Sequence, residues 1–477
     1  MNVNPCKPAI VILGAGPAGL GAAYRLARRQ SFHVTVIERN PRVGGNAGSF
    51  DVEGIRVDYG SHRLHPSCDP LVLSDIRELL GGDLLVRPRH GRILLQGRWI
   101  HFPLRPLDLI RRLPPSFILG VAADAFKRYV RRRGGRADET FESVMRQGVG
   151  GTISDEFYFP YVRKIWGAEP RELSPTQARR RVSAGSLGAM VKKVASGLRR
   201  SQGIQGGFFY YPRLGFGQIA SAYAEAAERC GATILRGASV TGVERRGERW
   251  AVDYSVGEGS GRVEADHVWS TIPLTALARS MAKDTPSEVL DAAGSISFRA
   301  MILVYLILSK SRFSEYDAHY FPGPEVGFSR VSEPKNYHGN PEPEGRTVLC
   351  GELPCSPNDS IWRQSDDALG RALVASLGAA GLSVGEGLRG VVTRRLRFAY
   401  PIYLSGYERH FERLEQWFDG MQNLITFGRQ GLFAHDNTHH ALFMAYCADQ
   451  CLDDAGNFDT AQWRRHLEDF KSHVVED

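Results

Sequence analysis

The first clear pattern in the chain is an unbroken apolar run, AIVIL at residues 9–13. A run without alternation is typical of a parallel strand that is buried on both faces. A glycine-rich turn and an Ala- and Leu-rich stretch to about Arg29 then predict a helix, and residues 33–37 predict a second strand that ends at Glu38. The N-terminal part is therefore predicted to form a complete β-turn-α-β unit.

The pattern changes in the middle of the chain. Between about Arg105 and Arg200 strand-like runs become rare, and stretches rich in Arg, Leu and Ala predict a largely helical insertion. Alternating segments then predict a meander of strands between residues 233 and 272. A return to α/β character is predicted to begin at 210–214. The other predicted elements are a helix at 218–229, strands of a second sheet at 300–308 and 348–353, a strand at 424–427 and, after a glycine turn, a helix at 439–452.

Composition and charge exclude several classes of protein. The 477 residues are 43% hydrophobic and 23% charged, as in an ordinary globular protein, and a net charge of +8 is too small to indicate nucleic-acid binding. The seven cysteines show no zinc-type spacing, which favours reduced thiols in the cytoplasm. The longest apolar run, residues 300–308, is too short to span a bilayer, so we expect a cytoplasmic protein that is soluble or peripheral to a membrane.

One stretch could mediate a peripheral membrane contact. Residues 117–121 are apolar, and Arg111, Arg112 and Arg131–Arg133 flank them. The alternative is an ordinary solvated basic helix face.

The candidate chemistry begins at the turn after the first strand, Gly14-Ala-Gly16-Pro17-Ala18-Gly19. In a dinucleotide fingerprint the first glycine permits the tight turn, the second lets the backbone approach a pyrophosphate, and the third lets helix and strand pack closely. The helix N-terminus then offers free N–H groups to the phosphates. Glu38 ends the second strand, where a carboxylate accepts from ribose hydroxyls and disfavours a 2′-phosphate, so the sequence predicts a dinucleotide site without NADP.

The segment after Glu38 favours FAD over NAD. Arg39 follows directly, and a basic residue, Arg42, leads to the paired glycines Gly44-Gly45 and to Asn46. Such a loop can wrap the far side of an extended dinucleotide, which NAD dehydrogenases do not require. We therefore expect non-covalent FAD.

The predicted architecture is an α/β fold with two interleaved domains. A Rossmann-like FAD-binding domain takes residues 1–90, 205–290 and 400–477. An α+β substrate domain, with a mixed sheet and the helical insertion, takes residues 91–204 and 291–399. We find no internal repeat, and the oligomeric state is not readable from the sequence.

These motifs resemble the FAD-binding opening of the amine oxidase and protoporphyrinogen oxidase superfamily, and within it the UDP-galactopyranose mutases. The matching segments run from Ile10 to Ala448. Beyond the opening they are DYGSHRLH at 58–65, FYFPYVRKIWG at 157–167, ARRR at 178–181, FSRVSEPK at 328–335, AYP at 399–401 and GRQG at 428–431.

The resemblance implies a role for several residues. His62 and His65 would lie at the flavin ring, and Tyr161 and Trp166 would lie in the substrate pocket, although a pair of aromatics at helical spacing is also typical of a core. Further flavin contacts are expected at Gly428, Arg429, Gly431 and Val240, and further substrate contacts at Arg180, Arg330, Tyr400 and His435.

The chain departs from the mutase pattern at two positions. Six residues after the flavin arginine the family has a tyrosine, and two further on an aspartate, where this chain has His435 and Asn437. The difference argues against carrying over UDP-galactose itself. His439 and His440 follow; without a third ligand in view, they are interpreted as capping or flavin-contact residues and no metal site is expected.

Three functions remain open. In the first, a redox-neutral mutase acts on a nucleotide-activated sugar through N5 of reduced FAD, with NAD(P)H as an external reductant; Arg330 and one of Arg179, Arg180 or Arg181 would hold the diphosphate, and His62, His65, Arg330 and Tyr400 would be catalytic. The second is an oxidase or desaturase that passes hydride from a small organic substrate to flavin. The third is a flavin-bound protein without turnover. For the arginine run the alternative is a solvated helix face.

Overall fold

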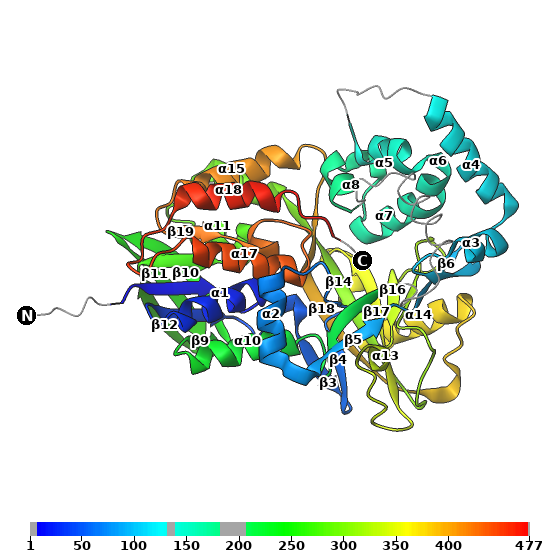
Figure 1. Ribbon diagram of the computed structural model, residues 1–477, viewed down its shortest axis with the longest axis horizontal. Coiled ribbons are helices and arrows are strands. Elements are labelled where there is room, and N and C mark those ends of the chain that lie inside the picture. The colour runs from blue at the N-terminus through cyan, green and yellow to red at the C-terminus, as the bar shows by residue number, and fades with distance from the viewer. Residues whose placement is uncertain (1–6, 131–138, 182–206, 476–477) are drawn as a thin grey trace, which may run out of the picture.

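The computed structural model describes residues 7–130, 139–181 and 207–475. Figure 1 shows an α/β lobe built around β1 and α1, a second sheet beside it that includes β14 and β17, and a group of helices, α4 to α8, at one end. The last described residues lie where these three parts meet. The predicted α/β fold with a mixed second sheet and a helical insertion is confirmed.

The first sheet is parallel and has five strands. Two of its strands, at residues 9–13 and 267–270, are almost completely buried, as the apolar run at residues 9–13 predicts for that strand. In the order of the sheet they are β19 (Leu424–Thr426), β13 (His267–Ser270), β1 (Ala9–Leu13), β2 (His33–Glu38) and β9 (Thr233–Arg236). Three separate parts of the chain therefore meet in one sheet.

Both faces of this sheet are covered. Three helices pack together on one face: α1 (Pro17–Arg28), α10 (Gln218–Arg229) and α17 (Thr438–Gln450). The predicted helix at 218–229 has these bounds. The other face carries β10 (Ala238–Arg246), β11 (Arg249–Val256), β12 (Gly259–Ala265), α11 (Leu274–Ser280), α12 (Ser287–Ser295) and α15 (Tyr407–Asp419).

The predicted meander at 233–272 is only partly correct. Its middle three strands, β10 to β12, form an antiparallel sheet, but its first and last strands, β9 and β13, belong to the parallel sheet. Alternation along the sequence cannot distinguish these cases, because the partner of each strand lies far away in the chain.

The second sheet has seven strands and is mixed. Its centre is β14, whose apolar side chains are buried between α14 (Asp366–Ala379) on one face and the β3–β4 hairpin on the other. In order the strands are β18 (Leu388–Ile402), β14 (Ser297–Leu308), β17 (Thr347–Cys355), β16 (Arg330–Ser332), β15 (Ala318–Tyr320), β6 (Gly91–Leu95) and β7 (Arg98–Phe102). The predicted domain boundary between residues 399 and 400 falls inside β18.

The insertion is helical as far as residue 181, and its last predicted part, residues 182–206, lies outside the described residues. No described helix is both long enough and apolar enough to cross a membrane. The helices are α3 (Pro106–Arg112), α4 (Pro115–Val130), α5 (Phe141–Val149), α6 (Gly151–Ile153), the π-helical turn η3 (Ser154–Tyr158), α7 (Phe159–Trp166) and α8 (Pro175–Arg181).

Smaller elements complete the two lobes. The segment at 210–214, where α/β character was expected to return, overlaps β8 (Phe208–Pro212), which pairs antiparallel with β5 (Leu84–Pro88) and joins neither large sheet. The others are β3 (Ser49–Val52), β4 (Ile55–Asp58), α2 (Pro70–Leu80), α13 (Pro334–His338), α16 (Gly428–Gly431), α18 (Thr460–Phe470) and the short turns η1 (Gly45–Ala47), η2 (Gly81–Asp83), η4 (Pro170–Glu172), η5 (Ser360–Arg363) and η6 (Gly385–Gly387).

Candidate active site

The turn between β1 and α1 has the geometry of a phosphate cradle. Gly14 has φ of +96°, which a side chain would strain, and a Cβ on Gly19 would lie 1.9 Å from the Gly14 carbonyl oxygen. Gly16 differs, since a Cβ there would meet nothing within 4 Å. The space before the N-terminus of α1 is thus open to a ligand, as a pyrophosphate requires.

Glu38 is positioned by the backbone around it. One carboxylate oxygen accepts from the N–H of Ala15 at 2.8 Å, and the other accepts from the backbone and side-chain amides of Asn40 at 2.8 and 2.6 Å. The side chain is buried yet lines the cavity. It therefore ties the end of β2 to the turn after β1, where a ribose would lie.

A cavity of about 950 Å³ runs from this cradle to the second sheet. That volume lies at the upper end of the usual range for ligand pockets, and suits a ligand as long as a dinucleotide together with a substrate. The predicted site residues on its wall are Gly14, Gly16, Pro17, Ala18, Glu38, Arg39, Gly45, Asn46, His62, His65, Tyr161, Val240, Arg330, Tyr400, Arg429 and His435.

Other predicted residues lie behind that wall. A Cβ on Gly428 would lie 2.7 Å from Cβ of Ala18, so this glycine lets α16 approach α1, while Gly44 donates its N–H to the Ala15 carbonyl at 2.7 Å. Six predicted residues do not line the cavity: Gly19, Gly44, Gly428, Gly431, Trp166 and Arg180. In this structure these six residues pack around the site, and their direct contacts with a cofactor or substrate stay predictions.

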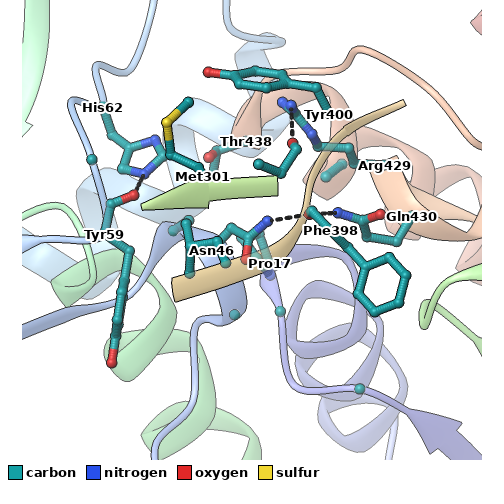
Figure 2. Close-up of a pocket in the computed structure, with 18 of the residues that line it drawn as sticks. Pro17, Asn46, Tyr59, His62, Met301, Phe398, Tyr400, Arg429, Gln430 and Thr438 are labelled. Carbon is teal, nitrogen blue, oxygen red and sulfur yellow. Dashed lines mark hydrogen bonds between the residues drawn. The ribbon is translucent and has the colours of Figure 1, made fainter. Parts of the chain in front are cut away.

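The loop after β4 presents His62 to the cavity. Asp58 anchors it: the buried carboxylate accepts from Ser49, from Tyr211 at 2.5 Å and from the Phe216 N–H at 2.9 Å. His62 Nε2 lies 3.0 Å from the Tyr59 carbonyl oxygen (Figure 2). Burial lowers the pKa of His62, although Asp58 opposes the shift, so the imidazole is neutral at pH 7 and Nε2 is the nitrogen that donates.

Arg330 lines the cavity as part of a buried ion pair. Its Nε and Nη2 donate to the two carboxylate oxygens of Glu352, each at 3.0 Å. Glu352 also accepts from the N–H of Ser61 at 2.8 Å, and Arg330 donates to the Ser61 carbonyl at 3.2 Å. The pair therefore fixes the loop that carries His62, and Arg330 keeps only Nη1 for a ligand.

A bulge in β18 forms the next part of the wall. Leu396 pairs with Met301 and Tyr400 pairs with Arg299, so β18 has two more residues than β14 between these pairs. The Phe398 carbonyl in the bulge accepts from Asn46 at 2.9 Å and from Gln430 at 2.7 Å, as Figure 2 shows. The bulge thus connects the second sheet to both cofactor loops.

Arg429 is held at the same place. Its Nη2 donates to the Ala399 carbonyl at 2.8 Å and its Nη1 to the Asp436 carbonyl at 2.9 Å. The guanidinium lies over the Tyr400 ring, 5.1 Å from its centroid. The predicted flavin arginine is therefore aimed at backbone oxygens and one aromatic face.

His435 is the centre of an aromatic group. Its ring stacks on Tyr400 at 6.2 Å and meets the edges of Tyr403 at 5.0 Å and Trp166 at 6.0 Å. Nε2 lies 3.1 Å from Gln177 Oε1. Arg180 donates to Tyr403 Oη at 3.0 Å and so contributes from the layer behind.

The cavity wall is strongly basic. Its carboxylates among the described residues are Glu38, Glu352 and Asp436, and all three side chains are buried. The guanidinium groups outnumber them three to one: Arg39, Arg42, Arg63, Arg89, Arg330, Arg394, Arg395, Arg397 and Arg429. Such a wall selects an anionic ligand.

Sequence reasoning missed three kinds of wall residue. Glu352 lies inside an apolar strand, β17, where a lone carboxylate was itself a signal because a buried charge needs a partner. Arg394 and Arg397 lie on β18, whose alternating basic residues were not interpreted as a cavity wall. Gln430 follows the predicted flavin arginine directly.

Comparison with known proteins identifies a family whose sequence pattern the chain matches. Residues 17–407 match the family described as flavin containing amine oxidoreductase. A putative flavin-containing monoamine oxidase, AofH, of Mycobacterium tuberculosis is 29% identical over 276 residues, which are 55% of this chain and 56% of the relative. Human protoporphyrinogen oxidase is 25% identical over 331 residues, 62% of this chain and 66% of the relative. The matches thus span little more than half to two thirds of these curated relatives.

The fold is shared with a solved structure. The crystal structure of reduced UDP-galactopyranose mutase superposes with a TM-score of 0.77 and 22% sequence identity, covering 93% of each chain. Identity at this level supports the shared architecture, and the residues of the cavity must carry any argument about the substrate.

Proposed function

This chain belongs to the flavin-containing amine oxidoreductase family and is an FAD-dependent enzyme, and from that premise we propose that it rearranges a nucleotide-activated sugar without net oxidation. The observation that carries the proposal is the basic cavity wall. A protonated amine or polyamine is repelled by such a wall, whereas the diphosphate of a nucleotide sugar is attracted to it.

The cradle residues fit FAD. Gly16 leaves room for the pyrophosphate, Glu38 lies where a ribose would be bound, and Asn46 belongs to the loop on the far side. Bound there in its reduced form, FAD supplies a nucleophilic N5, with NAD(P)H as the proposed external reductant. His62, neutral and oriented by the Tyr59 carbonyl, would itself add no charge beside the flavin.

The leaving diphosphate would be held by arginines. Arg330 offers Nη1, and its ion pair with Glu352 makes that atom rigid. Arg397 is exposed and makes no hydrogen bond or ion pair with any described residue, which leaves its fork available to phosphate oxygens. Tyr400, whose ring stacks on His435 and lies beside the Arg429 guanidinium, would border the sugar.

The test is a spectroscopic titration of the FAD-loaded, dithionite-reduced protein with UDP and with UDP-sugars. We expect a change in the flavin spectrum on binding, and turnover without oxygen consumption. Arg397→Ala should weaken UDP binding at least about tenfold, because one charge-assisted contact is lost. Arg389→Ala is the matched control, since Arg389 lies exposed on the same strand outside the cavity.

An oxidase function is the alternative, and the names of the two curated relatives favour it. If added substrate reduces oxidised flavin and consumes oxygen or a quinone, the mutase proposal is wrong. Equal UDP affinity in Arg397→Ala and Arg389→Ala would remove the argument from the basic wall.

A further inference from the structure

Three potential metal ligands meet beside the cavity, at the start of α17. Asp436 lies two residues before α17, His440 lies in the first turn of α17, and His473 comes from the segment after α18. An Asp436 carboxylate oxygen lies 3.8 Å from His440 Nδ1, and the other lies 3.5 Å from His473 Nδ1. One ligand atom from each residue lies within 4.8 Å of the others.

The chemistry of this set suits a transition metal. Two imidazoles and one carboxylate are ligands that divalent zinc, copper and iron accept. In a tetrahedral zinc site the ligand atoms are roughly 3.4 Å apart, so small side-chain rotations would close the observed separations. His440 Nδ1 accepts only a long hydrogen bond, 3.3 Å, from the Asn437 N–H, and a metal bond would replace it.

The three candidate ligands are largely shielded from solvent. The Asp436 side chain is only 2% exposed, and those of His440 and His473 are 15% and 13% exposed. The His440 and His473 rings are stacked, with their centroids 4.3 Å apart. A buried carboxylate needs a compensating positive charge, which a bound cation would supply.

A second observation points to a missing partner at this place. His439, 4% exposed, lies 4.1 Å from His440 between ring centroids, and its Nδ1 has no hydrogen-bond partner in the described structure. A buried nitrogen without a partner is costly. His440 thus gains, in the fold, the further ligands whose absence from the sequence pattern argued against a metal site, whereas His439 lies beside the three ligands and is not one of them.

The three ligands lie where the C-terminal segment reaches the cavity wall. After α18 the chain passes His473 to Val475, whose N–H donates to the Arg180 carbonyl at the end of α8 at 3.2 Å, and Val475 lines the cavity. We propose that Asp436, His440 and His473 bind a divalent transition-metal ion such as Zn²⁺, which fixes the C-terminal segment against the cavity wall.

The test uses the FAD-loaded protein after removal of metals with a chelator. Calorimetric titration should show one Zn²⁺ bound per chain. With Cu²⁺ as a probe, electron paramagnetic resonance should show hyperfine coupling to two imidazole nitrogens, a signal that oxidised flavin does not obscure. Zn²⁺ should also slow removal of the C-terminal residues by carboxypeptidase.

Variants distinguish this site from adventitious binding. His473→Ala should lower Zn²⁺ affinity at least about 100-fold and leave one coupled nitrogen, because a direct ligand is lost. Asp436→Asn should weaken binding with both nitrogens retained. His410→Ala, which changes a half-buried histidine on α15, should bind as the wild type does. Unchanged affinity in His473→Ala, with flavin still bound, would overturn the proposal.

Discussion

At the scale of single residues, the Arg330–Glu352 pair has the largest structural effect on the site. Both side chains are buried, and the carboxylate also holds the backbone of the His62 loop. Removing one partner of a buried ion pair leaves an uncompensated charge, whereas removing both does not.

We therefore expect Glu352→Gln to lower the free energy of unfolding by about 3 kcal/mol. The double variant Glu352→Gln/Arg330→Met should recover most of that loss in denaturant unfolding followed by circular dichroism. Equal stability of the two variants would mean that the pair is not electrostatically coupled.

His319 gives the molecule a pH dependence of stability. The side chain is buried, and its Nδ1 accepts a hydrogen bond from Arg92 Nε at 3.1 Å. Burial, and to a smaller extent the positive charge of Arg92, lower the pKa of the imidazole to about 3. Below pH 6.5 the unfolded chain binds a proton that the folded chain does not, so stability falls as the pH falls from 6.5 towards 3.

His319→Gln should flatten this dependence. Between pH 6 and 4 the unfolding free energy of the wild type should fall by up to about 1.4 kcal/mol per pH unit more than that of the variant. Urea unfolding at three pH values checks the difference. Parallel curves would show that His319 is protonated in the folded protein.

At the scale of elements, the first β-turn-α-β unit could be predicted from sequence because it is local. Its strand, glycine turn and helix lie within 30 residues, and β1, α1 and β2 have the predicted bounds to within one residue. The β5–β8 pair and the partners of Glu352 could not be predicted in this way, because each joins segments far apart in the chain.

Two glycines of the turn between β1 and α1 have different roles: Gly19 is needed for packing and Gly16 for ligand binding. Gly19→Ala places Cβ against the Gly14 carbonyl and should impair folding, whereas Gly16→Ala meets no protein atom. Gly16→Ala should therefore fold with a normal melting temperature as apoprotein but bind FAD at least about tenfold more weakly, because its methyl group enters the pyrophosphate space. Flavin fluorescence titration measures both variants; normal affinity in Gly16→Ala would contradict this position for the cofactor.

The helices α3 and α4 carry an apolar surface with basic neighbours. Leu107, Ile110, Leu119 and Phe126 are 55, 62, 69 and 70% exposed. The sequence places the expected membrane contact at residues 117–121, of which Leu119 is exposed and Phe117 is 9% exposed. If Leu119 and the exposed apolar residues near it in the chain make that contact, the protein should sediment with anionic vesicles in low salt.

Leu107→Ser/Ile110→Ser/Phe126→Ser should reduce that binding at least about tenfold, because apolar area leaves the lipid. A triple change at exposed apolar residues elsewhere, Leu71→Ser/Val86→Ser/Leu214→Ser, is the control. Equal losses in the two triples would assign the effect to general surface polarity.

At the scale of the whole molecule, the cavity lies between the two large sheets, and few local sequence patterns indicate that these sheets lie side by side. Motifs and the family resemblance predicted many residues of the cavity wall. The basic charge of that wall, and the bulge by which β18 connects the second sheet to the cofactor loops, became visible only in the structure. Arg180 and Trp166, which motif position assigns to the pocket, do not line the cavity, and their contact with a substrate stays a prediction.

Because the cavity wall comes from both lobes, removal of FAD should destabilise the whole molecule. At a cofactor concentration 1,000-fold above Kd the stabilisation is about 4 kcal/mol. The apoprotein should therefore melt at a lower temperature in a single transition. Two separated transitions, with only one shifted by FAD, would show that the lobes unfold independently.

The extra residues in β18 have a consequence for divergence. Asn46, Gln430 and Arg429 contact carbonyl groups of the bulge, which any amino acid supplies. The side chains of this stretch can therefore change, in evolution or by design of a new specificity, while these three side chains keep their hydrogen bonds to its backbone. Deleting two residues from the stretch, in contrast, would remove the bulge and these hydrogen bonds whatever side chains remained.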